Sequence, residues 1–243
     1  MLTGVDITSY GGDLPGKPEL GQMVRRLLAQ VPELPRLRLS SIDAIEIDDA
    51  LFEAVTGEAR IAPYLHLSLQ AGDNMILKRM KRRHLRGEAI DLCKALKKAR
   101  PEMMFGADFI AGFPTETEEM FEETLQLVDE ADLTFLHVFP YSVREGTPAA
   151  KMPQVSGDVI RARAARLRAK GEAALARHLG SQVGTRQRVL VERPDFGHTD
   201  QYTRIRLNGG ALSGAVSEVL ITGHDGHALI GEAQPHTETR RPL

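Results

Sequence analysis

The 243-residue sequence predicts an α/β protein in which a parallel, barrel-like sheet with covering helices precedes a small all-β barrel. In the first part of the chain, strand-like runs alternate with helical patterns, and their starts are 34, 28, 41 and 29 residues apart. That spacing is typical of βα units. After residue 177 the apolar period changes from about 3.6 to two, which indicates short hairpins. The predicted strands of the first part cover residues 2–7, 36–42, 64–70, 105–112 and 134–140.

Helical periodicity fills the intervals between these strands. Apolar residues from Leu20 to Val31 follow the i, i+4, i+7, i+8, i+11 rule for one buried helix face. Thr115 and Glu118 stand at the spacing of a capping box, which predicts that a helix begins there. An arginine-rich helix is predicted over 158–177. We favour a barrel for the parallel sheet, with an open doubly wound sheet as the alternative.

Polar side chains alternate with apolar ones in three of the predicted strands. In the strand over 64–70, Ser68 and Gln70 lie on the side opposite three leucines. Because parallel sheets are covered on both faces, a polar face on internal strands predicts a lumen where ligands bind at the carboxyl ends of the strands. The polar pattern recurs at Arg36, Arg38, Ser40, Asp108 and Gly112.

Composition indicates an ordinary soluble globular protein, with 42% hydrophobic residues, 26% charged residues and a formal net charge of −2. Apolar runs are too short to span a bilayer and no leader is recognised, so a cytoplasmic protein is expected. Charge is nevertheless segregated. Residues 78–100 carry an excess of +8, residues 106–132 hold nine acidic and no basic residues, and residues 161–177 hold six basic and one acidic. The basic segments are either solvated helix faces or a footprint for a phosphate backbone.

The single cysteine, Cys93, excludes a disulfide framework and any iron–sulfur or zinc site built only from cysteines of this chain. His224 and His227 are three residues apart at a predicted turn with no third ligand, so they are interpreted as exposed turn histidines. His66 and His137 occupy strand positions, where a satisfied core histidine is a serious alternative to a functional role for each. No nucleophile–base pair is evident, and no catalytic or metal-ligating residue is predicted.

Several segments together resemble one family, the radical S-adenosylmethionine methylthiotransferases. The opening Leu-Thr-Gly-Val-Asp-Ile and the segment Ser-Ser-Ile-Asp at 40–43 resemble its branch acting on threonylcarbamoyladenosine in tRNA. Residues near 180–233 resemble the family's TRAM domain, a small RNA-binding β-barrel. The resemblance implies a partial radical SAM (TIM-like) barrel over 1–177, a TRAM-like barrel over 178–233 and a tail over 234–243. The matching segments are 2–11, 36–43, 66–72, 105–117, 137–150 and 151–155.

The resemblance also implies where S-adenosylmethionine is held. Ser68 and Gln70 match the strand that reaches the ribose and methionine part of the cofactor. Gly112 matches the strand whose backbone passes close to the adenine, and Phe139 matches a wall of the adenine pocket. The alternation of polar residues selects Ser68, Gln70 and Gly112 independently.

The methionine end of the cofactor is expected nearer the amino terminus. Gly4 and Asp6 match the strand closest to the methionine amino group. Arg79 belongs to a basic segment from which one residue is expected to meet the cofactor carboxylate, while the others meet tRNA phosphates or solvent. This segment comprises Lys78, Arg79, Lys81, Arg82 and Arg83.

The family holds two four-iron, four-sulfur (4Fe–4S) clusters on six cysteines that this sequence lacks. We therefore expect a fragment, without the first barrel strand and its cluster loop, that is inactive alone. The implied reaction adds a methylthio group to C2 of N6-threonylcarbamoyladenosine in tRNA, with a sulfur donor and a reductant such as flavodoxin as partners and no membrane. The alternatives are isopentenyladenosine in tRNA, an aspartate of a ribosomal protein, or a cluster-free RNA-binding remnant.

Overall fold

The structure, a computed structural model, describes residues 1–4, 6–209 and 211–233. The chain divides into two compact units, Met1–Ala174 and Leu175–Leu243. This boundary and the predicted one after residue 177 both fall within helix α6 (Gly157–Gln182). The predicted tail over 234–243 lies outside the described residues. Among the helices of the described part, none is both long and apolar enough to cross a membrane.

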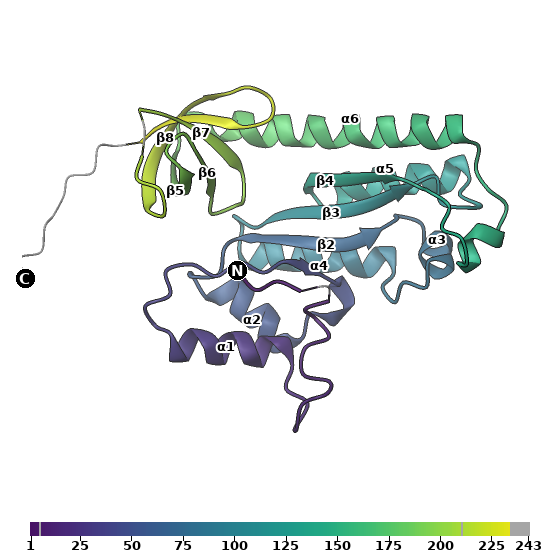
Figure 1. Cartoon of the computed structure of the whole chain (residues 1–243), viewed down its shortest axis with the longest axis horizontal. Helices are drawn as coiled ribbons and strands as arrows, with labels where there is room; N and C mark the ends of the chain where they lie inside the picture. The colour runs from purple at the N-terminus through teal and green to yellow at the C-terminus, as the bar shows by residue number, and fades with distance from the viewer. Residues whose placement is uncertain (5, 210, 234–243) are drawn as a thin grey trace, which may run out of the picture. The chain divides into compact units, whose positions relative to one another are not determined.

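The first unit contains a parallel sheet in the strand order β1-β2-β3-β4. The strands β2, β3 and β4 run in the same direction toward the end of the sheet where α3 lies (Figure 1). The predicted α/β class is confirmed, and over the described residues the sheet is open with four strands. Its elements are α1 (Leu20–Gln30), β1 (Ser41–Ile42), η1 (Ala44–Glu46), α2 (Asp49–Gly57), β2 (Tyr64–Gln70), α3 (Asn74–Arg79), α4 (Arg86–Ala99), β3 (Met104–Ala111), α5 (Glu118–Glu130), β4 (Leu133–Pro140), η2 (Pro148–Lys151) and the first part of α6.

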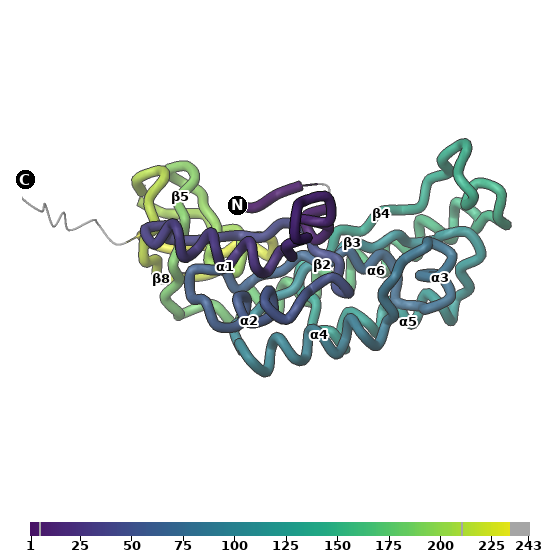
Figure 2. The backbone as a smooth tube through the Cα atoms, turned by 90° about the horizontal axis from the view of Figure 1, so that it is seen from below, coloured from purple at the N-terminus to yellow at the C-terminus, as the bar shows by residue number. Residues whose placement is uncertain are grey.

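The two faces of this sheet differ as the alternation predicts. On one face Leu65, Leu67 and Phe109 are fully buried in the main hydrophobic core. Helices α4 and α5 lie along the same side of β2 and β3 (Figure 2), and their apolar residues join that core. Because successive strand residues point to opposite faces, the other face carries the polar side chains. These are His66, Ser68, Gln70, Asp108 and His137.

Two predicted strands are shorter than expected. The strand predicted over 2–7 is represented, in the described residues, by one parallel bridge between Leu2 and Leu39. The strand predicted over 36–42 is regular only at Ser41–Ile42, which pairs with β2. The reason is that this segment changes partner along its length, since Leu37 bridges Ile61 before Leu39 bridges Leu2. A regular strand needs consecutive residues that pair with the same neighbouring strand, and within this segment only β1 meets that condition.

The predicted capping box at Thr115 is wrong. Helix α5 begins at Glu118, and its N-cap is Thr117, whose hydroxyl accepts the Met120 N–H at 3.3 Å. Thr115 instead lies in the preceding turn with a φ of 70°, where its hydroxyl accepts a hydrogen bond from Arg79. The turn between β3 and α5 therefore takes two more residues than the capping pattern indicated.

The segregated charges of the sequence meet inside the first unit. The acidic segment 106–132 forms β3 and α5, and both basic segments pair with it. The basic and acidic segments therefore form ion pairs with each other within the first unit. Neither interpretation of the basic segments had anticipated this. The pairs are Arg86 with Glu130, Lys97 with Asp132, Arg163 with Glu116 and Glu118, Arg166 with Glu118 and Glu122, and Lys170 with Asp129.

The second unit is the predicted small barrel, and its sheet is closed in the order β5-β6-β7-β9-β8. The short strand β6 contains Gly197 and His198. Gly197 is required there, since a Cβ at this position would lie 2.3 Å from the Leu190 carbonyl oxygen. Val189, Ile205 and Val219 fill the interior. The strands are β5 (Arg186–Arg193), β6 (Phe196–Thr199), β7 (Arg204–Asn208), β8 (Val216–His224) and β9 (Leu229–Ala233).

Candidate functional site

A pocket of about 200 Å³ lies where β1 and β2 end. Its lining is almost entirely polar or charged and combines three anionic or hydroxyl-bearing segments with the basic segment after α3. Two of the predicted cofactor-binding residues, Asp6 and Ser68, belong to this lining. The complete set is Asp6, Ser41, Asp43, Ser68, Lys81, Arg82 and Arg83. We refer to it as the strand-end pocket.

Arg82 holds the two strand ends of this pocket together. Its guanidinium donates to the Ser68 carbonyl oxygen at 2.6 Å and to Asp43 Oδ2 at 3.1 Å. Burial alone raises the pKa of the Asp43 carboxyl, but the His84 ring, 3.5 Å away, and the neighbouring Arg82 guanidinium outweigh burial and lower it. Asp43 is therefore ionised at neutral pH and neutralises Arg82. Arg83 is likewise paired, with Glu46, and Lys81 completes the basic side of the lining.

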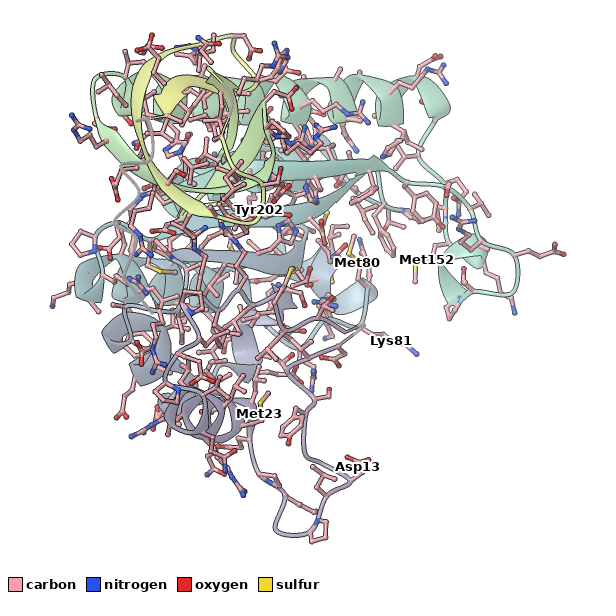
Figure 3. All side chains as sticks on the ribbon, turned by 60° about the vertical axis from the view of Figure 1, so that its left-hand side comes forward. Asp13, Met23, Met80, Lys81, Met152 and Tyr202 are labelled. Atoms are coloured by element: carbon pink, nitrogen blue, oxygen red, sulfur yellow. The ribbon has the colours of Figure 1, made fainter. Side chains whose placement is uncertain are left out.

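Asp6 adds a further carboxylate to the lining. Its carboxylate accepts the Ser9 hydroxyl at 2.6 Å and the Thr8 hydroxyl at 2.9 Å. The Ser9 hydrogen bond lowers the pKa of Asp6 most, so this carboxylate carries a negative charge at neutral pH. Gly4, two residues earlier, is exposed, and a Cβ there would lie 3.0 Å from Ile7 Cγ2. On the basic side, Lys81 projects beyond the ribbon from the loop after α3 (Figure 3).

Gln70 and Gly112 end two neighbouring strands in left-handed backbone conformations, with φ values of 70° and 77°. A register shift between Leu67 and Gln70 accompanies the first. A left-handed non-glycine residue at a strand end is a local strain of the kind that gathers at binding sites. Gly112 is required by close packing as well, because a Cβ there would lie 2.6 Å from Ile160 Cγ1. Its N–H donates to Glu116 Oε2 at 2.9 Å.

The two remaining predicted residues lie elsewhere. Arg79 donates to Thr115 Oγ1 at 2.7 Å and so connects the end of α3 with the β3–α5 turn, whereas Lys81 and Arg83 of the same basic segment line the pocket. Phe139, near the end of β4, is 52% exposed. It shares a sheet face with His137, two residues before it.

Sequence reasoning missed two features of this sheet face. Ser41 and Asp43 line the pocket, and their signal was the Ser-Ser-Ile-Asp segment at the end of a predicted strand. The second feature is a cluster in mid-strand, where His66 Nε2 and His137 Nδ1 lie 2.9 and 3.1 Å from Asp108 Oδ1. His66 is buried, but the interpretation of His137 as a core histidine is wrong, since its side chain is 62% exposed. Its strand pairs on one side with β3 and its ring faces outward from the core.

Comparison with known proteins places this geometry in a family. The model of the radical SAM superfamily matches residues 3–128, which is more than half of the chain. The chain belongs to the radical SAM superfamily. Within the known structures, coproporphyrinogen III oxidase (HemN) from Escherichia coli, a radical SAM enzyme, aligns with a TM-score of 0.52 at 17% identity. The alignment covers 92% of this chain and 58% of the oxidase, and it supports the fold.

Curated relatives of this radical SAM chain are tRNA-modifying enzymes by name. Threonylcarbamoyladenosine tRNA methylthiotransferase MtaB of Rickettsia prowazekii is 50% identical over 223 residues, covering 92% of this chain and 53% of the relative. MtaB of Bacillus subtilis is 36% identical, covering 86% and 48%. The tRNA-2-methylthio-N(6)-dimethylallyladenosine synthase of Ehrlichia chaffeensis is 39% identical, covering 63% and 34%. The chain spans about half the length of the curated relatives it matches.

The superfamily uses S-adenosylmethionine and 4Fe–4S clusters, and the described residues fit the two groups differently. The strand-end pocket offers a carboxylate for an ammonium group and cations for a carboxylate. Its volume is below the ~300–1,000 Å³ of ligand pockets, so it fits the amino-acid end of the cofactor and not the whole molecule. For a cluster the fit fails. Cys93 is buried in α4, and burial raises the pKa of its thiol to about 12, whereas cluster ligands are thiolates.

Proposed function

We propose that this chain forms the S-adenosylmethionine-binding part of a tRNA methylthiotransferase that adds a methylthio group to C2 of N6-threonylcarbamoyladenosine. The observation that carries the proposal is the 50% identity over 92% of the chain to an enzyme named for that substrate. Relatives named for dimethylallyladenosine match at 39% identity or below, which favours the threonylcarbamoyl substrate. Aspartate of a ribosomal protein has no support among these relatives.

The residues of the first unit would bind and orient the cofactor. Asp6 would accept the ammonium group, while Lys81 and the Glu46-paired Arg83 would meet the carboxylate, because side chains of both signs line the strand-end pocket. Ser68 and Gln70, on the polar face of β2, would contact the ribose and methionine part. Bound S-adenosylmethionine supplies the methyl group and the radical chemistry of the superfamily.

The adenine would lie toward β3 and β4. Phe139 presents an exposed ring near the end of β4, and an aromatic face is a platform on which an adenine stacks. Gly112 would contribute through its backbone, because Ile160 fills the space that a side chain at this position would take. Gly4 would leave room beside the amino-acid end, and Arg79 would act indirectly, by holding the β3–α5 turn through Thr115.

The described residues do not supply the remaining participants in the proposed reaction. They include the thiolates of both 4Fe–4S clusters, a sulfur donor and a reductant such as flavodoxin. We assign no step of the reaction to a cluster on this chain. A tRNA substrate implies a cytoplasmic location.

The second unit would serve as a TRAM-like RNA-binding barrel. Arg186 and Arg204 are exposed on its strands, and cations of this kind bind phosphates with a strong dependence on salt. Arg188 and Arg206 are partly neutralised, because they lie 3.6 and 3.1 Å from the carboxylates of Asp200 and Asp225.

Deleting the gene that encodes this chain should abolish 2-methylthio-N6-threonylcarbamoyladenosine in hydrolysed tRNA, because the proposed enzyme is its source. Liquid chromatography with mass spectrometry should show the unmethylthiolated nucleoside accumulating, and a plasmid copy should restore the product. Loss of the dimethylallyladenosine product instead would overturn the substrate assignment. Unchanged levels of both products would overturn the proposed activity and support an RNA-binding remnant.

Replacing Asp6 with asparagine should weaken binding of S-adenosylmethionine to the purified chain about tenfold or more, because the charge-assisted hydrogen bond to the ammonium group is lost. Isothermal titration calorimetry measures this. Asp13→Asn is the matched control, since Asp13 is an exposed aspartate at the tip of the loop before α1, away from the lining residues (Figure 3). Equal affinities of the two variants would remove Asp6 from the proposed site.

A further inference from the structure

Three side chains able to bind a metal converge in the middle of the sheet. None of them belongs to the lining of the strand-end pocket, and Ser41 of that lining is the register partner of His66. His66, Asp108 and His137 come from β2, β3 and β4 in turn, and register brings them together on one face. His66 pairs with Gly106, Asp108 pairs with His137, and the three ligand atoms lie within 4.8 Å of one another. We propose that these three residues bind a first-row divalent cation such as Zn²⁺ or Fe²⁺.

The distances between the donor atoms suit a shared ion. His66 Nε2 and His137 Nδ1 lie 2.9 and 3.1 Å from the same oxygen, Asp108 Oδ1. Neighbouring ligands at ~2.0–2.2 Å from one metal ion stand ~3.0–3.5 Å apart, depending on the coordination geometry. An ion that replaces the two shared protons would lie between the three donor atoms, with the carboxylate oxygen drawn back and the two nitrogens turned toward the ion. The His137 side chain is 62% exposed, so its ring can turn to meet such an ion.

His66 has the second partner that metal-binding histidines require. Its Nδ1 lies 3.0 Å from the Tyr64 hydroxyl, which can donate or accept and so holds either tautomer of the ring. This pair needs Gly106 beside it, because a Cβ at that position would lie 2.4 Å from the Tyr64 hydroxyl and 2.7 Å from His66 Nδ1. A glycine in the middle of a buried strand weakens that strand. Gly106 nevertheless leaves the space in which the Tyr64 hydroxyl can hold the His66 ring.

Two histidines and one carboxylate leave coordination positions open. Sites of this composition hold zinc or non-haem iron and keep room for water or a further ligand. Exposure of His137 and partial exposure of Asp108 open the cluster to the space in front of the polar face. The cation would therefore be reachable from the face on which the cofactor is proposed to lie, while none of its ligands is a residue of the strand-end pocket.

Titration of the chelator-treated full chain with Co²⁺ tests the site, since Co²⁺ occupies zinc and iron sites and gives a visible absorption spectrum. We expect one saturating equivalent that Zn²⁺ displaces. Asp108→Asn and His137→Ala should weaken Co²⁺ binding about 100-fold, and Tyr64→Phe about tenfold, the range found for residues that support a metal ligand. His227→Ala is the matched control, because His227 is an exposed histidine in the second unit.

Circular dichroism of the metal-free variants checks that they remain folded, and Asn retains the shape of Asp108. Absence of a saturable Co²⁺ spectrum in the unsubstituted chain would overturn the proposal. So would Co²⁺ affinity that is unchanged in Asp108→Asn, or affinity that is lost in His227→Ala. None of these outcomes bears on S-adenosylmethionine binding, so failure of the metal site and failure of the proposed function are distinguishable.

Discussion

Replacing Arg163 with methionine should lower the free energy of unfolding by about 3–5 kcal/mol, the cost of leaving a buried charge without its partner. The guanidinium of Arg163 donates to Glu116 Oε2 and to the Glu116 carbonyl oxygen, both at 2.9 Å, and the two side chains are 6% and 2% exposed. The same carboxylate accepts the Gly112 N–H. Loss of Arg163 should therefore also weaken the hydrogen bonds that hold the β3–α5 turn in place. Urea denaturation followed by circular dichroism measures the effect.

The effect should depend on pH in a defined direction. Burial raises the pKa of Glu116, and the Arg163 charge opposes that shift, so the variant raises the pKa further. A raised folded-state pKa means that stability is greatest below the unfolded value near 4.5 and declines as pH rises through the folded value. The decrease in the free energy of unfolding caused by Arg163→Met should therefore be small in acid and reach its full size at neutral pH. Arg161→Met, which removes an exposed pair with Asp158 in the same helix, should change stability by no more than ~0.5 kcal/mol. Equal losses in both variants would contradict the buried pair as the cause.

Replacing Phe109 with alanine should cost about 3–5 kcal/mol, because a fully buried ring leaves both lost transfer energy and a cavity. Phe109 lies on the core face of β3, between Gln70 of β2 and Val138 of β4 in the sheet register. Its register partners are held in the parallel sheet by their hydrogen bonds to β3, which limits how far they can move into the space. The midpoint of urea denaturation reports the loss.

Phe139→Ala is the matched control for that substitution. Phe139 is 52% exposed, so its removal should change stability by no more than ~0.5 kcal/mol. If Phe139 stacks on the adenine, its removal should instead weaken S-adenosylmethionine binding by ~1–3 kcal/mol, which calorimetry detects. A large stability loss in Phe139→Ala would show that the ring belongs to the core and not to the proposed site.

Much of the first unit was predictable because its patterns are local. The period-2 alternation over 64–70 coincides with β2, and the i, i+4 spacing from Leu20 coincides with α1. The same alternation placed Ser68 and Gln70 on a polar face opposite buried leucines. Such patterns reflect which side of an element meets the core, and each residue carries that information in its own polarity.

Other features were not predictable because they depend on partners far away in the chain. Thr115 and Thr117 both could cap α5, and a contact with Arg79, 36 residues earlier, occupies the first of them. The acidic and basic segments were visible, yet the pairing of Arg163 with Glu116 follows from the packing of α6 against the β3–α5 turn. Sequence composition shows the charges but not the distances between them.

By itself, the sequence determined the α/β class, the polar face of the parallel sheet, the closed small barrel and the membership of a superfamily. Only the tertiary structure decided which polar residues meet. It brought Asp6 and the loop after α3 to one pocket, and it joined His66, Asp108 and His137 at one oxygen. The physical reason is that strand register and crossover packing set the distances between residues from separate elements, and those distances are absent from any local pattern.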